Sequence, residues 1–256
     1  MNPLKHILLE LQEISLLITR AFLSIFSKPR YYSETIKRMD VIGVGSLPII
    51  LLTGFFTGGV LTLQSYPTLA SYGGQSQTGQ LVAFTLIREL GPVLSALMVA
   101  GRIGSAISAE LGSMVVSQQI DAMRAFGTDP IRKLVLPRII ALVTMLPLLT
   151  VAADISGIIG GGVVASYIYN HDYNIFISSA RVGISIEDIL GGIIKPLFFG
   201  LIIGSIACYR GLNTTGGTVG VGRATTSAVV QSSITVIITD FFISRALQHI
   251  LGTNPI

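Results

Sequence analysis

Five long apolar runs set the expected architecture of the chain. The first, residues 41–63, contains 23 residues and no charge. At about 1.5 Å per residue, such a helix is long enough to cross a hydrocarbon core of roughly 30 Å. Four further runs, at about 81–107, 139–169, 189–209 and 228–247, are apolar but carry a few charged residues. This pattern predicts an all-α membrane protein with five transmembrane helices.

The N-terminal segment has a different pattern. Apolar residues recur at helical spacing over 4–26, and most charged residues fall on the opposite side. Glu10 and Glu13 interrupt the apolar run and no small-residue cleavage site follows, which is not typical of a secretory signal. We expect residues 1–38 to form an interfacial helix and linker ahead of a membrane domain in 39–256. An amphipathic helix packed on a soluble core is the alternative.

Composition supports the membrane class. The chain is 50% hydrophobic and only 12% charged, with a mean hydropathy of +0.72, whereas soluble proteins are about 25% charged. The single Cys208 excludes an intrachain disulfide framework, and His6, His171 and His249 are too far apart in sequence to predict a metal site. The net charge of +4 comes without a nucleic-acid-binding motif, so we expect no nucleic-acid partner.

The basic residues predict the orientation of the chain. The two connections 64–80 and 170–188 contain only Arg181, whereas twelve basic residues precede the first span or lie in the other two connections. The positive-inside rule then places the N-terminus in the cytoplasm and the C-terminus outside. Three pairs of glycines spaced four apart predict close contacts between helices. They are Gly54 with Gly58, Gly157 with Gly161, and Gly200 with Gly204.

Several charged residues lie within the predicted spans. They are Arg88, Glu89, Asp154, Lys195 and Asp240. Each costs about 2.5–3.5 kcal/mol at a helix centre on insertion scales, so we expect these side chains to face the bundle interior, a partner or a water-filled cavity. Neighbouring residues lie about 100° apart around a helix, so Arg88 and Glu89 do not readily pair with each other.

Arg88 and Lys195 are predicted at similar depth, towards the outer side of their spans. Two basic groups at this level would suit a phosphate head group. The other interpretation is a structural network, for example Glu89 with Lys195, that fixes the register of the helices. The two roles are compatible.

The cytoplasmic connection 109–138 contains a short predicted helix. Its apolar stripe is formed by Met114, Ile120, Met123 and Phe126. We expect the helix to end at Gly127, and Asp129 with Pro130 to start the next turn. A connection of this length that folds into its own helix favours a docking element, the alternative being a simple connector.

The glycine-rich segment 209–226 resembles a phosphate-binding loop only superficially. The Walker pattern requires lysine and then serine or threonine after its last glycine, but Gly222 is followed by Arg223 and Ala224. We therefore expect a tight turn into the last span and no nucleotide binding by this chain.

Four sequence stretches together resemble the MlaE (YrbE-like) family of ABC-transporter permeases, over about residues 35–247. They are "LIRELGPVLSALMVAGRIGSAISAELGSM", "IDAMRAFGTDPIRKLVLPR", "GVGRATTSAVVQSSI" and "TDFF". The resemblance implies a bacterial inner-membrane homodimer that binds a cytoplasmic ABC ATPase and a periplasmic MCE-domain protein. A STAS-domain accessory protein is a further possible partner. Such transporters move phospholipid and maintain outer-membrane lipid asymmetry, and ATP with magnesium binds the ATPase, so no cofactor or catalytic residue is expected on this chain.

The resemblance also implies roles for particular residues. Arg88, Glu89 and Lys195 match positions lining the family's lipid cavity, and residues of about 112–127 match its coupling helix. The expected contacts with the ATPase are Gln118, Asp121, Met123, Phe126 and Asp129. The chain has "SQQID" where many relatives carry an acidic residue, so Gln118 puts details of that contact in doubt.

A channel subunit is the alternative from a different functional class. Glu89, Asp154 and Asp240 would then form a relay for protons or ions across the membrane. This alternative needs no ATPase.

Overall fold

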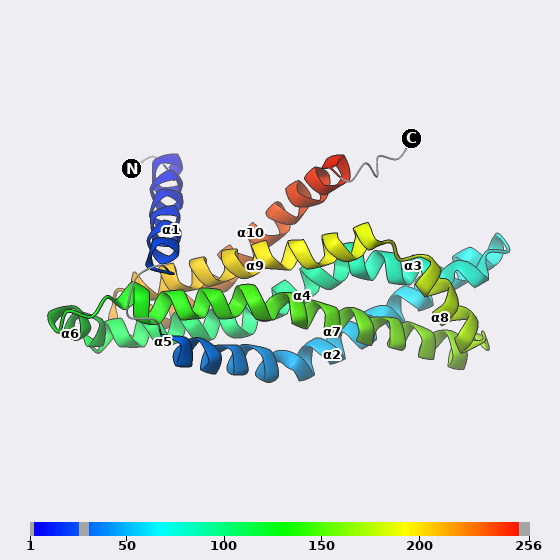
Figure 1. Ribbon diagram of the computed structural model, residues 1–256, viewed down its shortest axis with the longest axis horizontal. Helices are drawn as coiled ribbons and strands as arrows, with labels where there is room; N and C mark the ends of the chain where they lie inside the picture. The colour runs from blue at the N-terminus through cyan, green and yellow to red at the C-terminus, as the bar shows by residue number, and fades with distance from the viewer. Residues whose placement is uncertain (1–2, 26–30, 251–256) are drawn as a thin grey trace. The chain divides into compact units, whose positions relative to one another are not determined.

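The structure is a computed structural model that describes the backbone of residues 3–25 and 31–250 and the side chains of residues 8–24 and 31–249. Every element in this part of the chain is a helix (Figure 1). The α-helices are α1 (Pro3–Ile25), α2 (Tyr32–Ser71), α3 (Thr78–Thr85), α4 (Gly91–Val99), α5 (Ser105–Val116), α6 (Gln119–Ala125), α7 (Leu136–Tyr169), α8 (Tyr173–Val182), α9 (Ile186–Leu212) and α10 (Gly217–Ile250). Four short elements are a 3₁₀ turn, η1 (Gln75–Gln77), and three π-helical turns, η2 (Leu86–Leu90), η3 (Ala100–Gly104) and η4 (Ile131–Val135).

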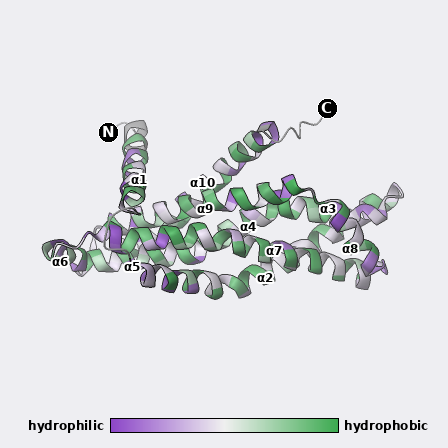
Figure 2. Cartoon of the chain, viewed as in Figure 1, coloured by the Kyte–Doolittle hydropathy of each residue, from purple (hydrophilic) through white to green (hydrophobic). Residues whose placement is uncertain are grey.

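Among the described residues, five helical runs are long and apolar enough to cross a membrane, which confirms the predicted all-α class. They are Tyr32–Ser71, Gln75–Val116, Ile131–Tyr169, Ile186–Leu212 and Gly217–His249. Figure 2 shows hydrophobic residues along most of their length. The helices extend beyond the apolar runs because the polar flanking residues continue the helical hydrogen bonds. Pro48, Pro147 and Pro196 lie inside α2, α7 and α9 without ending them.

The chain divides into two compact units, each assembled from three stretches. The first unit holds 1–42, 99–144 and 199–236, and the second holds 43–98, 145–198 and 237–256. The functional residues described below fall into one unit or the other.

In the first unit, glycines allow α9 to contact α7. A Cβ atom at Gly200 would lie 2.8 Å from the carbonyl oxygen of Leu142, and one at Gly204 would lie 3.2 Å from Leu142 Cδ1. Ala207, Cys208 and Ile203 are fully buried on the same helix. The predicted role of the Gly200 and Gly204 pair is therefore confirmed.

Helix α1 packs in the first unit against the end of α9. The hydroxyl of Tyr209 donates to the carboxylate of Glu13 at 2.6 Å, and Arg210 pairs with Glu10 at 2.9 Å. Ala21 of α1 is buried, whereas Leu23 is exposed. The helix thus has the amphipathic character that its sequence predicts, and whether its exposed face lies in the membrane interface stays a prediction.

In the second unit, the remaining glycine pairs bring α2 against α7. A Cβ atom at Gly58 would clash with the carbonyl of Gly157, and one at Gly54 would clash with the carbonyl of Ala153. Gly161 in turn lies against the carbonyl of Gly58. Only residues without a side chain permit this separation between backbones, so these predicted contacts are also confirmed.

A short helix, α8, covers α3 in the second unit. Asp172 begins α8 by accepting a hydrogen bond from the backbone N–H of Asn174 at 2.7 Å. Phe176 of α8 is buried in a cluster with Val82, Leu86 and Ala165. This helix lies in the connection that the basic residues predict to be outside.

The glycine-rich segment forms a tight turn into the last helix, as predicted. Gly216 and Gly217 have φ angles of 88° and 66°, a region that favours glycine. Helix α10 begins at Gly217, earlier than the predicted 228. Most of the segment 209–226 is therefore helical, and its turn lies between the end of α9 and these two glycines.

Candidate functional site

A π-helical turn in the second span exposes one backbone carbonyl to a neighbouring helix. Within η2, the N–H of Gly91 donates to the carbonyl of Leu86, five residues earlier. Pro92 has no N–H to offer the carbonyl of Arg88, four residues before it. The ammonium of Lys195, on α9, donates to that carbonyl at 2.7 Å. The turn thus provides an acceptor that an uninterrupted α-helix would not have.

Lys195 is the centre of a buried ionic cluster in the second unit. Its residue is 1% exposed. The ammonium lies 2.7 Å from Glu89 Oε2 and 3.2 Å from Asp240 Oδ1, on α10. The hydroxyl of Ser244, also on α10, donates to Glu89 at 3.2 Å. Of the three N–H donors of the ammonium, two bind Glu89 and the Arg88 carbonyl, and Asp240 adds an ionic contact.

The side chain of Arg88 follows a different direction from that of Glu89. Its guanidinium lies 3.7 Å from the carboxylate of Asp188 and 5.1 Å from the centre of the Phe84 ring. Asp188 is itself fixed at the start of α9, where the N–H and the hydroxyl of Ser185 both donate to it. Arg88 therefore has its own acidic neighbour, as expected for residues about 100° apart on a helix.

The space within this cluster is small. Arg88, Glu89, Asp188, Lys195 and Ser244 help to line a cavity of about 20 Å³, room for roughly one water molecule. The structure pairs Glu89 with Lys195, which is the contact that the register interpretation requires. A lipid-binding role for Arg88, Glu89 and Lys195 stays a prediction.

The other two predicted intramembrane charges have different surroundings. Asp240 joins the Lys195 cluster, as described above. Asp154, on α7, is buried against Gly91 instead, and its Oδ1 has no hydrogen-bond partner among the described residues. The structure thus brings Arg88, Glu89, Lys195 and Asp240 together and leaves Asp154 outside the group.

The predicted coupling helix is shorter than the range 112–127. Helix α5 continues to Val116, and Gln118 then adopts a left-handed φ of 58° before the seven-residue α6. This break separates Met114 from Ile120, so the predicted stripe of Met114, Ile120, Met123 and Phe126 is wrong as one helical face. Ile120 is 3% exposed, whereas Phe126 is 86% exposed.

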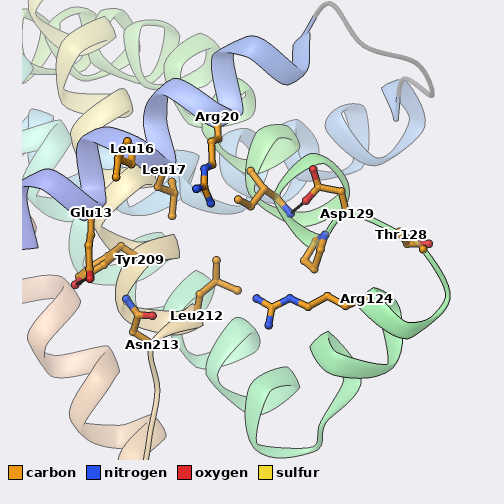
Figure 3. Close-up of a pocket in the computed structure, with 13 residues that line it drawn as sticks. Glu13, Leu16, Leu17, Arg20, Arg124, Thr128, Asp129, Tyr209, Leu212 and Asn213 are labelled. Carbon is orange, nitrogen blue, oxygen red and sulfur yellow. Dashed lines mark hydrogen bonds between the residues drawn. The ribbon is translucent and has the colours of Figure 1, made fainter.

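The end of α6 follows the predicted capping pattern. Gly127, with a φ of 73°, donates to the carbonyl of Arg124, and Thr128 donates to that of Met123. Both bonds belong to a Schellman motif. Asp129 then accepts from the N–H of Ile131 at 2.9 Å and starts the next helix (Figure 3). The predicted stop at Gly127 and start at Asp129 are confirmed.

The surface of this connection is available for a partner. The side chain of Asp121 is 71% exposed, and Gln118, Phe126 and Asp129 are also exposed, while Met123 is half-buried. These are the residues expected to contact an ATPase, and that role stays a prediction.

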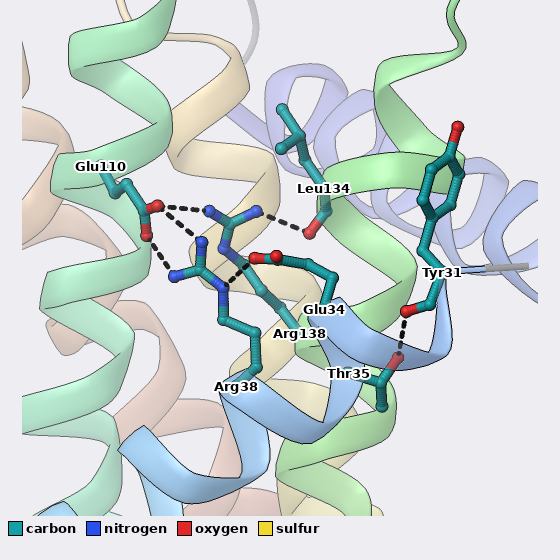
Figure 4. A network of polar contacts seen from close by, with 7 residues as sticks. All are labelled: Tyr31, Glu34, Thr35, Arg38, Glu110, Leu134 and Arg138. Atoms are coloured by element: carbon teal, nitrogen blue, oxygen red, sulfur yellow. Dashed lines mark hydrogen bonds and ion pairs between the residues drawn. The ribbon is translucent and has the colours of Figure 1, made fainter.

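A second ionic cluster, in the first unit, joins the helix that leads into α6 to two other helices (Figure 4). Arg38 of α2 donates to both carboxylate oxygens of Glu110 at 2.8 Å, and Arg138 of α7 lies 2.9 Å from the same carboxylate. Arg138 is 1% exposed and also donates to the carbonyl of Leu134 at 2.6 Å. Sequence reasoning treated both arginines as topology signals and did not identify Glu110 as their partner.

A family model described as "Permease MlaE" matches residues 35–246. The chain belongs to the MlaE permease family. The four stretches that suggested this resemblance include η2, α6 and the start of α10, so the Lys195 cluster and the α6 connection both contain family residues.

Curated relatives agree with the MlaE assignment. The chain is 39% identical to a "Probable ABC transporter permease protein" of Rickettsia typhi, over 95% of both chains. It is 38% identical to the "Intermembrane phospholipid transport system permease protein MlaE" of Haemophilus influenzae, over 88% of both. It is 37% identical to the chloroplastic protein TRIGALACTOSYLDIACYLGLYCEROL 1 of Arabidopsis thaliana, over 95% of this chain and 69% of the relative. As an MlaE permease, the chain is a multi-pass transport subunit and not an enzyme.

Proposed function

We propose that this chain is the membrane subunit of an ABC transporter that moves phospholipid between the bacterial inner membrane and a periplasmic MCE-domain protein. Such transport would maintain the lipid asymmetry of the outer membrane. The observation that carries the proposal is the match of residues 35–246 to the MlaE permease model. The name of the Haemophilus relative, which specifies phospholipid transport, supports the substrate class.

The exposed face of α10 supports a homodimer. Only 17% of the apolar window in Gly217–His249 is buried, the smallest share among the five spans. Large apolar side chains are exposed along this helix, namely Val230, Ile234, Ile237, Ile238, Phe241 and Phe242. Pairing with a second copy would cover these side chains. Asp240 and Ser244 of the same helix would then connect the dimer contact to the Lys195 cluster.

Within this proposal, the two basic residues have different tasks. Lys195 holds Glu89 and Asp240 and thereby fixes η2, α9 and α10 in register. The side chain of Arg88 is 22% exposed and its planar guanidinium can bind a phosphate through two N–H groups, so we assign it to receive the lipid phosphate. This division combines the two interpretations that the sequence leaves open.

Energy for transport would come from a separate ABC ATPase, which binds ATP and magnesium. The N-terminus and the α6 connection would lie in the cytoplasm and the C-terminus in the periplasm. The ATPase would contact the exposed residues around α6, and its closure would be transmitted through α5. A STAS-domain protein is a further expected partner on the cytoplasmic side.

The experiment that tests this function is gentle purification of the tagged chain from its native membrane. Mass spectrometry should identify an ABC ATPase, an MCE-domain protein and phospholipid with it, and the reconstituted complex should move labelled phospholipid only with ATP. A chain that co-purifies with neither protein and moves no lipid would exclude the proposal.

One observation favours the channel alternative. The carboxyl of Asp154 is buried without a hydrogen-bond partner for Oδ1 in the described part of the chain, and it shares a unit with Glu89 and Asp240. A proton pathway would use such groups. The channel alternative predicts a proton flux into liposomes that contain this chain as their only protein, and this flux should vanish in the Glu89→Gln variant. An absence of flux in the wild-type chain would exclude the channel.

A further inference from the structure

One cavity of the first unit lies between α1, the end of α6 with the connection that follows it, and the end of α9. Its volume is about 720 Å³, within the range of small-molecule binding sites. The walls that matter here are Glu13 and Arg20 of α1, Arg124 and Asp129 of the connection, and Leu212 of α9. None of these residues belongs to the Lys195 cluster.

The polar groups of this cavity carry both signs of charge. The side chains of Arg20 and Arg124 point into it from different walls (Figure 3). Arg124 has one contact of 3.3 Å with Asp121, in which both side chains are well exposed. Glu13 and Asp129 each accept one hydrogen bond, from Tyr209 and Ile131 respectively, which leaves further acceptor capacity on both carboxylates. A ligand with a phosphate and an ammonium would match the two arginines and the carboxylates.

A second cavity, also formed by α1, is wholly apolar in its exposed lining. It measures about 110 Å³ and lies between Ile18, Ala21 and Phe22 of α1 and the first turns of α7. The α7 residues Ile139, Ile140 and Val143 form the opposite wall. Residues 127–131 line the polar cavity, and the α7 residues of the apolar cavity follow them in the sequence, within the third span.

The order of the two cavities has the polarity of a membrane lipid. The polar cavity lies next to the connection that the basic residues predict to be cytoplasmic, and the apolar one lies beside residues that enter the span. We propose that α1 and the 127–144 segment form a binding site for a glycerophospholipid of the cytoplasmic leaflet with a primary ammonium, such as phosphatidylethanolamine. Its phosphate lies between Arg20 and Arg124, its ammonium faces Asp129, and an acyl chain follows Ile18 and Phe22.

This site is independent of the proposed transport pathway. It uses none of Arg88, Glu89 or Lys195, and its occupant would link α1 to the segment that follows α6. Lipid binding at this site can be measured without any transport. If no lipid binds here, the proposed transport function still stands, and if the chain moves no lipid, this site can still bind one.

Tryptophan fluorescence provides a direct test, because the chain contains no tryptophan. Phe22→Trp places a single reporter in the apolar cavity, and Leu52→Trp, on an exposed position of α2, reports on bulk lipid. The full-length variants are reconstituted in liposomes with increasing fractions of phosphatidylethanolamine or phosphatidylcholine that carry brominated, quenching acyl chains. Phosphatidylcholine serves as a control, because its quaternary ammonium has no N–H to donate.

We expect brominated phosphatidylethanolamine to quench the Phe22→Trp variant at a lower fraction than it quenches the Leu52→Trp variant. The expected preference over phosphatidylcholine is about fivefold, the factor that corresponds to one net hydrogen bond of about 1 kcal/mol. Asp129→Asn should abolish the preference, because it removes the charged acceptor of the ammonium. Arg20→Ala with Arg124→Ala should weaken the binding of both lipids, since both carry a phosphate, whereas Arg223→Ala, which removes an exposed arginine of α10, should change neither.

Two outcomes would overturn the proposal. Identical quenching curves at the two reporter positions would show that α1 contacts only bulk lipid. Inorganic phosphate that binds the detergent-solubilised chain through Arg20 and Arg124, without any lipid preference in the Phe22→Trp variant, would show an anion site in place of a lipid site. Circular dichroism of each variant confirms that the helices are retained.

Discussion

Arg38 donates two parallel hydrogen bonds to Glu110, each 2.8 Å long, and so ties α2 to the helix that leads into the α6 connection. Arg138 approaches the same carboxylate from α7 at 2.9 Å. Glu110 thus contacts both arginines, whereas Glu34 contacts Arg38 within the same helix, and the arrangement predicts an asymmetry between substitutions at this cluster.

Glu110→Gln should destabilise the protein far more than Glu34→Gln. Without the carboxylate, the buried Arg138 loses its ionic partner, and we expect a loss of about 2–4 kcal/mol, reduced from the fully buried case because Glu110 is 41% exposed. Glu34 contacts Arg38 through an i,i+4 pair, worth about 0.3–0.5 kcal/mol. Unfolding in a mixed-micelle denaturant series measures both values, and equal losses would contradict the assignment.

Lys195→Met should also destabilise the protein. It leaves Glu89 and Asp240 without their shared cation, at an expected cost of about 2–3 kcal/mol, since Glu89 retains solvent contact. Adding Glu89→Gln and Asp240→Asn should recover most of the loss, because no uncompensated charge is then left in the span. The same unfolding measurement serves as the readout, and a triple variant no more stable than the single one would count against this cluster.

Arg88→Ala should separate lipid retention from stability. The ion pair of Arg88 with Asp188 is longer than that of Lys195 with Glu89, and Arg88 is more exposed than Lys195, so its loss should destabilise the protein less than Lys195→Met does. The proposed phosphate contact is charge-assisted, so the variant should bind phospholipid about tenfold more weakly. Phosphorus per mole of purified protein provides the measurement. Arg181→Ala, an exposed arginine of α8, is the matched control and should retain lipid normally.

Gly58→Ala should disrupt the contact between α2 and α7. The added methyl group would meet the carbonyl of Gly157, a backbone atom that moves only with its helix, at a cost of about 1–3 kcal/mol. Gly222→Ala is the control, because nothing lies within 4 Å of its position and alanine favours the helix by about 0.5–1 kcal/mol. Thermal inactivation should therefore shift in opposite directions for the two variants.

Phe126→Asp should weaken the binding of the ATPase. An aromatic side chain that is 86% exposed at the end of α6 suits an interface anchor, and its loss is expected to cost about 2 kcal/mol, or roughly 30-fold in affinity. Val182→Asp, 82% exposed on α8, is the control on the opposite predicted side. Pull-down with the purified ATPase gives the result, and equal retention by both variants would exclude α6 as the contact.

The local features of this fold were predictable from the sequence. An uncharged run such as 41–63 specifies a span by its own composition, and the stop at Gly127 with the start at Asp129 depends on residues next to each other in the chain. The contact of Glu89 with Lys195 was one of two interpretations that the sequence left open, since depth and helical angle restrict the partners of a charge within a span without choosing among them.

Features that depend on tertiary contacts were not predictable. In sequence, the buried Arg138 resembles an ordinary cytoplasmic arginine, since only the fold reveals that Glu110 lies opposite it. Asp188 offered one weak signal, a serine three residues before it at the start of an apolar run. The π-helical turn at Leu86–Leu90 had a single sequence correlate, Pro92, which does not distinguish a π turn from a kink.

The carbonyl of Arg88 that receives Lys195 has a consequence for substitutions at position 88. Every residue at position 88 has a main-chain carbonyl, and this carbonyl stays available to Lys195 as long as residue 92 is a proline, which has no N–H. The side chain at position 88 can therefore change without removing the acceptor that anchors α9. Under the proposed function, the group offered to a lipid phosphate and the group that holds Lys195 would belong to different atoms of one residue.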